Sequence, residues 1–119
     1  FDMINAMAEK KQKKAMELYY DLLALKEPPM RILYLITRQF NLLMQVKELS
    51  EEGYSAKTIS ERLKMAGFIV RNCLRQAEYF SLKTLKEALQ DCVRMEEAVK
   101  TGRMNDVMSV ELLLVKYSS

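Results

Sequence analysis

The feature that most constrains the fold of this chain is a long apolar-rich segment, residues 30–52, between two strong helix signals. Pro28 and Pro29 precede it and Gly53 follows it, the places where prolines and glycines belong at the start and end of a helix. Its apolar residues recur at steps of three and four and cover more than half of a helix circumference: Ile32, Leu33, Leu35, Ile36, Phe40, Leu42, Leu43, Val46 and Leu49. A helix of this kind packs against partners on several sides, so residues 30–52 are predicted to be the central helix of the domain.

Shorter helical patterns fill the rest of the chain. Residues 2–8 predict a short helix, and the lysine-rich residues 9–14 predict a connector before a helix that ends near Lys26. After Gly53 the apolar spacing predicts four more helices, over residues 55–64, 68–79, 81–101 and 105–117. Ser55 and Ser81 are predicted N-caps, and Gly102 is predicted to end a helix. Two of the predicted inward stripes are Ala15, Leu18, Leu22 and Leu25, and Ile69, Val70, Cys73, Leu74 and Ala77.

No strand pattern interrupts these helices, and the plentiful Leu, Ala, Glu, Lys, Met and Arg are strong helix formers. A chain of 119 residues has the length of one domain. The sequence therefore predicts one all-α domain, a compact bundle of about five to seven helices around the long central helix.

Several kinds of chemistry have no residues to support them. The chain has no histidine, the commonest general base and metal ligand, and its three glycines stand apart, which excludes a glycine-rich phosphate loop. Cys73 and Cys92 lack metal-knuckle spacing and are predicted to be buried thiols in a reducing compartment. We expect no catalytic residue, no cofactor, no metal and no membrane-spanning segment, and the net charge of +3 is too small to require a nucleic-acid partner.

Residues 55–80 contain a pattern typical of a helix-turn-helix DNA-binding module. Two short helices meet at a tight turn, and the second is predicted to show four polar side chains outward that can read bases or grip phosphate: Arg71, Asn72, Arg75 and Gln76. Ser60 and Lys64 depart from the motif, which prefers a small apolar residue and a glycine at these places. Helical periodicity produces such pairs in many all-α domains, so DNA binding is the alternative hypothesis.

The polar edge of the central segment is a candidate protein interface. Arg38, Gln39 and Lys47 lie among mostly apolar neighbours, and polar groups on such a helix need partners. Two interpretations stay open, namely contact with a partner protein and a solvated outer edge of the helix.

A succession of short motifs resembles the C-terminal domain of the delta subunit of bacterial DNA polymerase III, a component of the clamp loader. The motifs are Leu22-Leu23, the proline-bounded start of the central helix, Arg38-Gln39-Phe40, Leu42-Leu43, residues 45–49, Gly53-Tyr54-Ser55, residues 74–77, Phe80-Ser81, residues 100–103 and residues 112–114. Their order and spacing fit nearly the whole chain. One departure lies at Ala66-Gly67-Phe68, where such domains commonly carry a histidine-proline pair.

The resemblance implies a cytoplasmic collar domain that holds the clamp loader together through the collar domains of the other subunits, of the gamma/tau and delta-prime types. It also implies that the chain is a C-terminal fragment, without the two AAA+-like N-terminal domains of the family. In that family the N-terminal part contacts the sliding clamp, and delta does not hydrolyse ATP. The expected function of residues 1–119 is therefore oligomerisation without catalysis, with only indirect contact to DNA.

Overall fold

Helix α3, Pro29–Glu51, is the axis of the domain in the computed structural model, which describes residues 2–119. Pro28 is extended and Pro29 opens the first turn, where its missing N–H costs nothing. At the other end Gly53 takes a left-handed φ of 96°. The amides of Gly53 and Tyr54 donate to the carbonyls of Ser50 and Leu49, which closes the helix in a Schellman motif. The predicted central helix is confirmed, shifted by one residue at each end.

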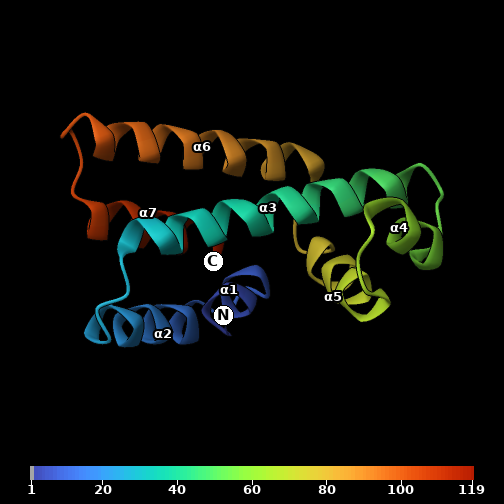
Figure 1. Cartoon of the computed structure of the whole chain (residues 1–119), viewed down its shortest axis with the longest axis horizontal. Coiled ribbons are helices and arrows are strands. Elements are labelled where there is room, and N and C mark those ends of the chain that lie inside the picture. Colours follow the sequence, from blue (N-terminus) through green and yellow to red (C-terminus); the bar gives the residue numbers. More distant parts are fainter. Residues whose placement is uncertain (1) are drawn as a thin grey trace.

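Six further helices of the described residues surround α3 (Figure 1): α1 Asp2–Ala8, α2 Gln12–Ala24, α4 Ala56–Leu63, α5 Gly67–Ala77, α6 Leu82–Lys100 and α7 Asp106–Tyr117. In Figure 1, α6 runs along α3, α7 lies behind it, and α4 and α5 gather near its C-terminal end. Helix α3 contacts five of the others: α1, α4, α5, α6 and α7. At about 1.5 Å per residue it spans about 34 Å, most of the 42 Å long dimension of the domain. The predicted all-α bundle around a central helix is confirmed.

The core is densest around the middle of α3. The ring of Phe40 is fully buried and packs edge-on against Phe80, at a centroid distance of 5.9 Å, and against Tyr117, at 5.2 Å. Edge-to-face aromatic pairs add about 0.5–1.5 kcal/mol beyond the burial of their area. The three rings tie α3 to the start of α6 and to the end of α7.

Side-chain caps begin three of the helices. Ser55 Oγ accepts from the amide of Thr58, and Ser81 Oγ accepts from the amide of Thr84, as the sequence predicts. Asn105 Oδ1 accepts from the amide of Met108 in the same way. Each cap satisfies a backbone donor that the helix itself leaves unpaired.

Helices α1, α2 and α4 end close to the predicted positions, but each is closed by a lysine whose backbone conformation was not predicted. Lys10, Lys26 and Lys64 all adopt positive φ, the conformation usually reserved for glycine. Because Lys10 reverses the chain sharply, the connector after α1 is shorter than predicted and α2 already begins at Gln12. Because α2 ends before Lys26, Leu25 is 78% exposed, and its predicted inward position is wrong.

Candidate interaction surfaces

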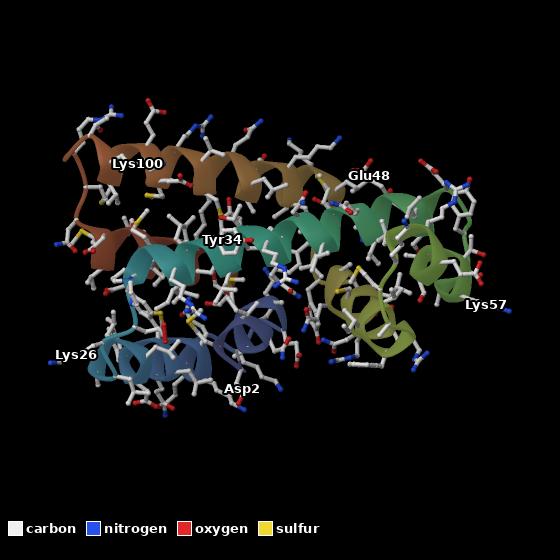
Figure 2. All side chains as sticks on the ribbon, in the orientation of Figure 1. Asp2, Lys26, Tyr34, Glu48, Lys57 and Lys100 are labelled. Carbon is white, nitrogen blue, oxygen red and sulfur yellow. The ribbon has the colours of Figure 1, made fainter. Side chains whose placement is uncertain are left out.

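An open groove runs between α1, α3 and α5. One wall is a single face of α3, because its lining residues are spaced three and four apart. The groove has a volume of about 230 Å³ and is lined by Ile4, Asn5, Leu35, Arg38, Gln39, Leu42 and Ile69. Figure 2 labels Tyr34 on α3, the residue directly before Leu35 of this wall. We call this feature the α1–α3–α5 groove.

A chain of hydrogen-bonded amides connects the three helices of the groove. Its centre is Gln76 of α5, which is fully buried. Gln76 Nε2 donates to Asn5 Oδ1 at 2.9 Å and to Glu9 Oε2 at 3.2 Å. Gln76 Oε1 accepts from Gln39 Nε2 at 2.7 Å. Both the donor and the acceptor end of the Gln76 side chain therefore have partners, as a buried amide requires.

Glu9 fixes the direction of this amide chain. An ionised carboxylate only accepts hydrogen bonds, so the atom of Gln76 that faces Glu9 is the Nε2 donor. The same amide nitrogen faces Asn5, which must present its oxygen, and the oxygen of Gln76 must then face the nitrogen of Gln39. One carboxylate thus sets the orientation of three amides.

Glu9 is held in its ionised form. Burial opposes ionisation, but hydrogen bonds from Gln76 and Lys11 and the charge of Arg75 hold the pKa of this carboxyl below its ordinary value of 4.5. The Lys11 and Arg75 nitrogens lie 3.4 and 3.5 Å from the carboxylate oxygens. The site therefore has a fixed negative charge, which these partners already neutralise.

The structure separates the three residues predicted as an interface. Arg38 is exposed at the groove and forms no ion pair within residues 2–119. Gln39 is half-buried and belongs to the amide chain. Lys47 lies elsewhere, and its Nζ donates to the carbonyl of Ala77 at 3.0 Å, which caps the last turn of α5. Arg38 and Gln39 thus share one site, and Lys47 has an internal role.

The α4–α5 pair has the two helices and tight turn of the predicted module. Arg71 and Arg75 are exposed, but Arg75 is paired with Glu9 and also donates to Asn72. The predicted outward position of Gln76 is wrong, because its side of α5 packs toward α1 and α3. Sequence periodicity could not place Gln76, since the amide partners that make its burial possible lie far along the chain.

Helix α7 carries a second surface. Met108, Leu112 and Val115 follow one another at steps of four and three, and each is between 44% and 54% exposed. Tyr20 of α2 is also about half exposed and lies beside this stripe, next to Glu111. Desolvation and the neighbouring Glu111 carboxylate raise the pKa of Tyr20. We call Tyr20, Met108, Leu112 and Val115 the α7 patch.

Leu112 and Val115 were not predicted as surface residues, because they lie outside the inward apolar stripe of α7. The sequence does contain a signal for this surface, because apolar residues occur on every side of α7. A helix that is apolar all round is normally buried. The open side of α7 is therefore a second candidate for protein contact.

Neither surface brings together the acidic or thiol side chains that a metal site would need. Within residues 2–119 no group of three or more His, Cys, Asp or Glu side chains is placed to hold a metal ion. Cys73 and Cys92 are buried, as predicted, and burial raises the pKa of both thiols, which makes them poor nucleophiles. None of the helices in this part of the chain is long and apolar enough to cross a membrane.

Comparisons with known proteins give consistent matches over nearly the whole chain. The family model for "DNA polymerase III delta subunit, C-terminal domain" matches residues 1–117. The DNA polymerase III subunit delta of Bacillus subtilis (strain 168) is 34% identical over 116 residues, which are 98% of this chain and 33% of that protein. The solved Bacillus subtilis DNA clamp loader delta protein superposes with a TM-score of 0.88 at 33% identity, over 99% of this chain and 35% of that one. The chain spans about a third of the length of these relatives.

Proposed function

Because the chain belongs to the family of C-terminal domains of DNA polymerase III delta proteins, we propose that it is an assembly domain of a clamp loader. In this proposal it binds the collar domains of the other loader subunits, of the gamma/tau and delta-prime types, in the cytoplasm. It performs no catalysis itself and acts on DNA only through the assembled loader, which places the sliding clamp. The sequence resemblance to this family is confirmed by the family match.

One observation supports the assembly function: helix α7 is mostly buried, but one of its apolar sides is exposed. Val110, Leu113 and Leu114 of α7 are fully or almost fully buried in the domain. Leu112 and Val115, on the other side of the helix, are about half exposed. Contiguous exposed apolar side chains of this kind mark protein interfaces in soluble proteins. The α7 patch therefore suits the packing of a helix from a neighbouring protein of the loader.

Its composition and surroundings also fit an interface. Aromatic residues and methionine, both present in the α7 patch, are enriched at protein interfaces. Charged groups border the patch, with Glu111 on the α2 side and Lys116 paired to Asp91 of α6 at 2.7 Å. An apolar centre with a polar rim is the usual anatomy of a protein interface.

A mixing experiment with a matched pair of variants tests this proposal. The chain is titrated into the collar domains of the other loader subunits, and association is measured by calorimetry and light scattering. We expect Leu112→Arg to weaken association by about a hundredfold or more, because burial of the leucine is lost and a guanidinium is desolvated. Val93→Arg is the control, since Val93 is an exposed apolar residue of α6 outside the patch. Unchanged binding by Leu112→Arg, or no association of the unaltered chain, would refute the assembly function.

DNA binding by the α4–α5 pair remains the competing hypothesis. The observation in its favour is Arg71, which is exposed on α5 and forms no ion pair within the described residues. Titration of the unaltered chain with duplex DNA at two salt concentrations separates the two functions. Sequence-specific, salt-sensitive binding that Arg71→Glu abolishes would replace the assembly proposal.

A further inference from the structure

The α1–α3–α5 groove has a cation that the domain itself does not neutralise. Arg38 is exposed at the groove and has no carboxylate within ion-pair distance in residues 2–119. Glu9, at the far end of the amide chain, is already held by Lys11 and Arg75. Arg38 is thus the charged side chain among the residues that line the groove. Its free guanidinium is complementary to an added carboxylate.

Four of the residues that line the groove with Arg38 are aliphatic. Leu35 and Leu42 of α3 are half-buried, Ile69 of α5 is 38% exposed, and Ile4 of α1 lies at the base of the groove. A site for a drug-sized ligand or cofactor usually measures about 300–1,000 Å³. The volume of about 230 Å³ is smaller. It suits one or two side chains of a polypeptide.

The amide chain also determines which hydrogen bonds the groove can offer. Gln76 occupies the oxygen of Asn5 and the nitrogen of Gln39. Asn5 therefore keeps its Nδ2 donors, and Gln39 keeps its Oε1 acceptor. Together with the guanidinium of Arg38, this gives donors for a carboxylate and one acceptor for a peptide N–H.

We propose that the α1–α3–α5 groove binds a segment of a partner protein in which one carboxylate side chain stands beside aliphatic residues. Arg38 holds the carboxylate, helped by Asn5, while Gln39 accepts from the backbone of the segment. The aliphatic residues lie against Leu35, Leu42 and Ile69. The groove shares no residue with the α7 patch, so this inference goes beyond collar assembly and does not depend on it.

A peptide titration of the unaltered chain tests the proposal directly. The probes are two capped pentapeptides that carry either glutamate or glutamine between two leucines. Binding is followed by NMR through the side-chain signals of Arg38, Asn5 and Gln39. We expect the glutamate peptide to bind about tenfold or more tightly than the glutamine peptide, as a charge-assisted hydrogen bond implies.

Three variants separate the contributions of charge and shape. Arg38→Gln should abolish the preference for the glutamate peptide, whereas Arg31→Gln should preserve it. Arg31 is the matched control because it is exposed on the same helix and is paired with Glu27 outside the groove. Ile69→Ser should weaken both peptides about equally. Circular dichroism checks that each variant remains helical.

Four results would overturn the proposal. The first is equal affinity for the two peptides, and the second is a set of perturbed signals that lie outside the groove. The third is an equal response to acetate, which would identify a site for small carboxylates. The fourth is a shift of the Arg38 signal when the chain alone is concentrated, which would identify a second copy as the occupant. Since no collar domain is present in these titrations, their outcome is independent of the assembly proposal, and Arg38→Gln should leave collar association intact.

Discussion

The buried amide of Gln76 gives the sharpest test of how the domain is held together. Gln76→Met preserves the approximate size and the helix propensity of the side chain but removes all of its hydrogen bonds. In the native domain these bonds join α5 to Asn5 and Glu9 on the α1 side and to Gln39 on α3. The substitution therefore tests the connection between three helices without opening a large cavity.

The expected loss follows from the three hydrogen bonds. The bonds to Asn5 and Gln39 join neutral groups and are worth about 0.5–1.5 kcal/mol each, and the bond to ionised Glu9 is worth about 1.5–3 kcal/mol. Part of this sum is recovered, because Asn5 is exposed, Gln39 is half-buried and Glu9 keeps Lys11 and Arg75. We therefore expect a net loss of about 2–3 kcal/mol in the free energy of unfolding.

Urea denaturation measures this loss. With a slope of about 1–3 kcal/mol/M, the midpoint should fall by about 0.7–3 M with little change in slope. Gln90→Met on the exposed side of α6 is the control, and it should change stability by no more than about 0.5 kcal/mol. If Gln76→Met proves as mild as Gln90→Met, the amide chain does not hold the three helices together and the reasoning fails.

Three further predictions concern stability. The pKa values of Glu9 and Asp91 lie below their ordinary values of 4.5 and 3.8. In acid the unfolded state therefore binds more protons than the folded state. The free energy of unfolding should be highest above about pH 5 and should fall as the pH drops through the folded pKa values. Thermal unfolding between pH 2 and 7 should show a flatter acid limb for Glu9→Gln and for Asp91→Asn. Phe40→Ala should cost about 3–5 kcal/mol in urea denaturation, and a cost below about 1.5 kcal/mol would contradict the aromatic core. Lys26→Gly should raise the urea midpoint, because glycine adopts the left-handed conformation without strain; the free energy of unfolding should increase by about 0.5–1 kcal/mol. Lys10→Gly should instead lower the midpoint, because Lys10 Nζ also donates to the carbonyl of Tyr117 and lies over the ring of Phe80.

Much of the fold could be predicted because its signals are local. The prolines before α3, the glycine after it and the serine caps act through backbone geometry within a few residues. The helices that end at Lys10, Lys26 and Lys64 were predicted, but the left-handed conformation of these lysines was not, because no local signal marks it. No residue near Lys10 in the sequence predicts a left-handed conformation there. The side chain of Lys10 contacts Phe80 and Tyr117, which lie far along the chain.

The candidate surfaces were predictable only in part. Helical periodicity identified Arg38 and Gln39 as polar positions on an apolar helix, and both line one groove. It placed Gln76 outward, because helical periodicity describes a helix alone and assigns a polar residue to water. Only the approach of α1 and α3 supplies the partners that let this amide be buried.

The sequence by itself determined that this chain forms an all-helical domain around one long helix. These properties depend on residue type and spacing, which are fixed before the chain folds. The tertiary structure decided which sides of those helices stay open. Apolar residues occur on every side of helix α7, and the packing of α1, α2, α3 and α6 against it leaves Met108, Leu112 and Val115 uncovered. An interface depends on which surface the neighbouring helices leave exposed, and that is settled only when all of them have packed.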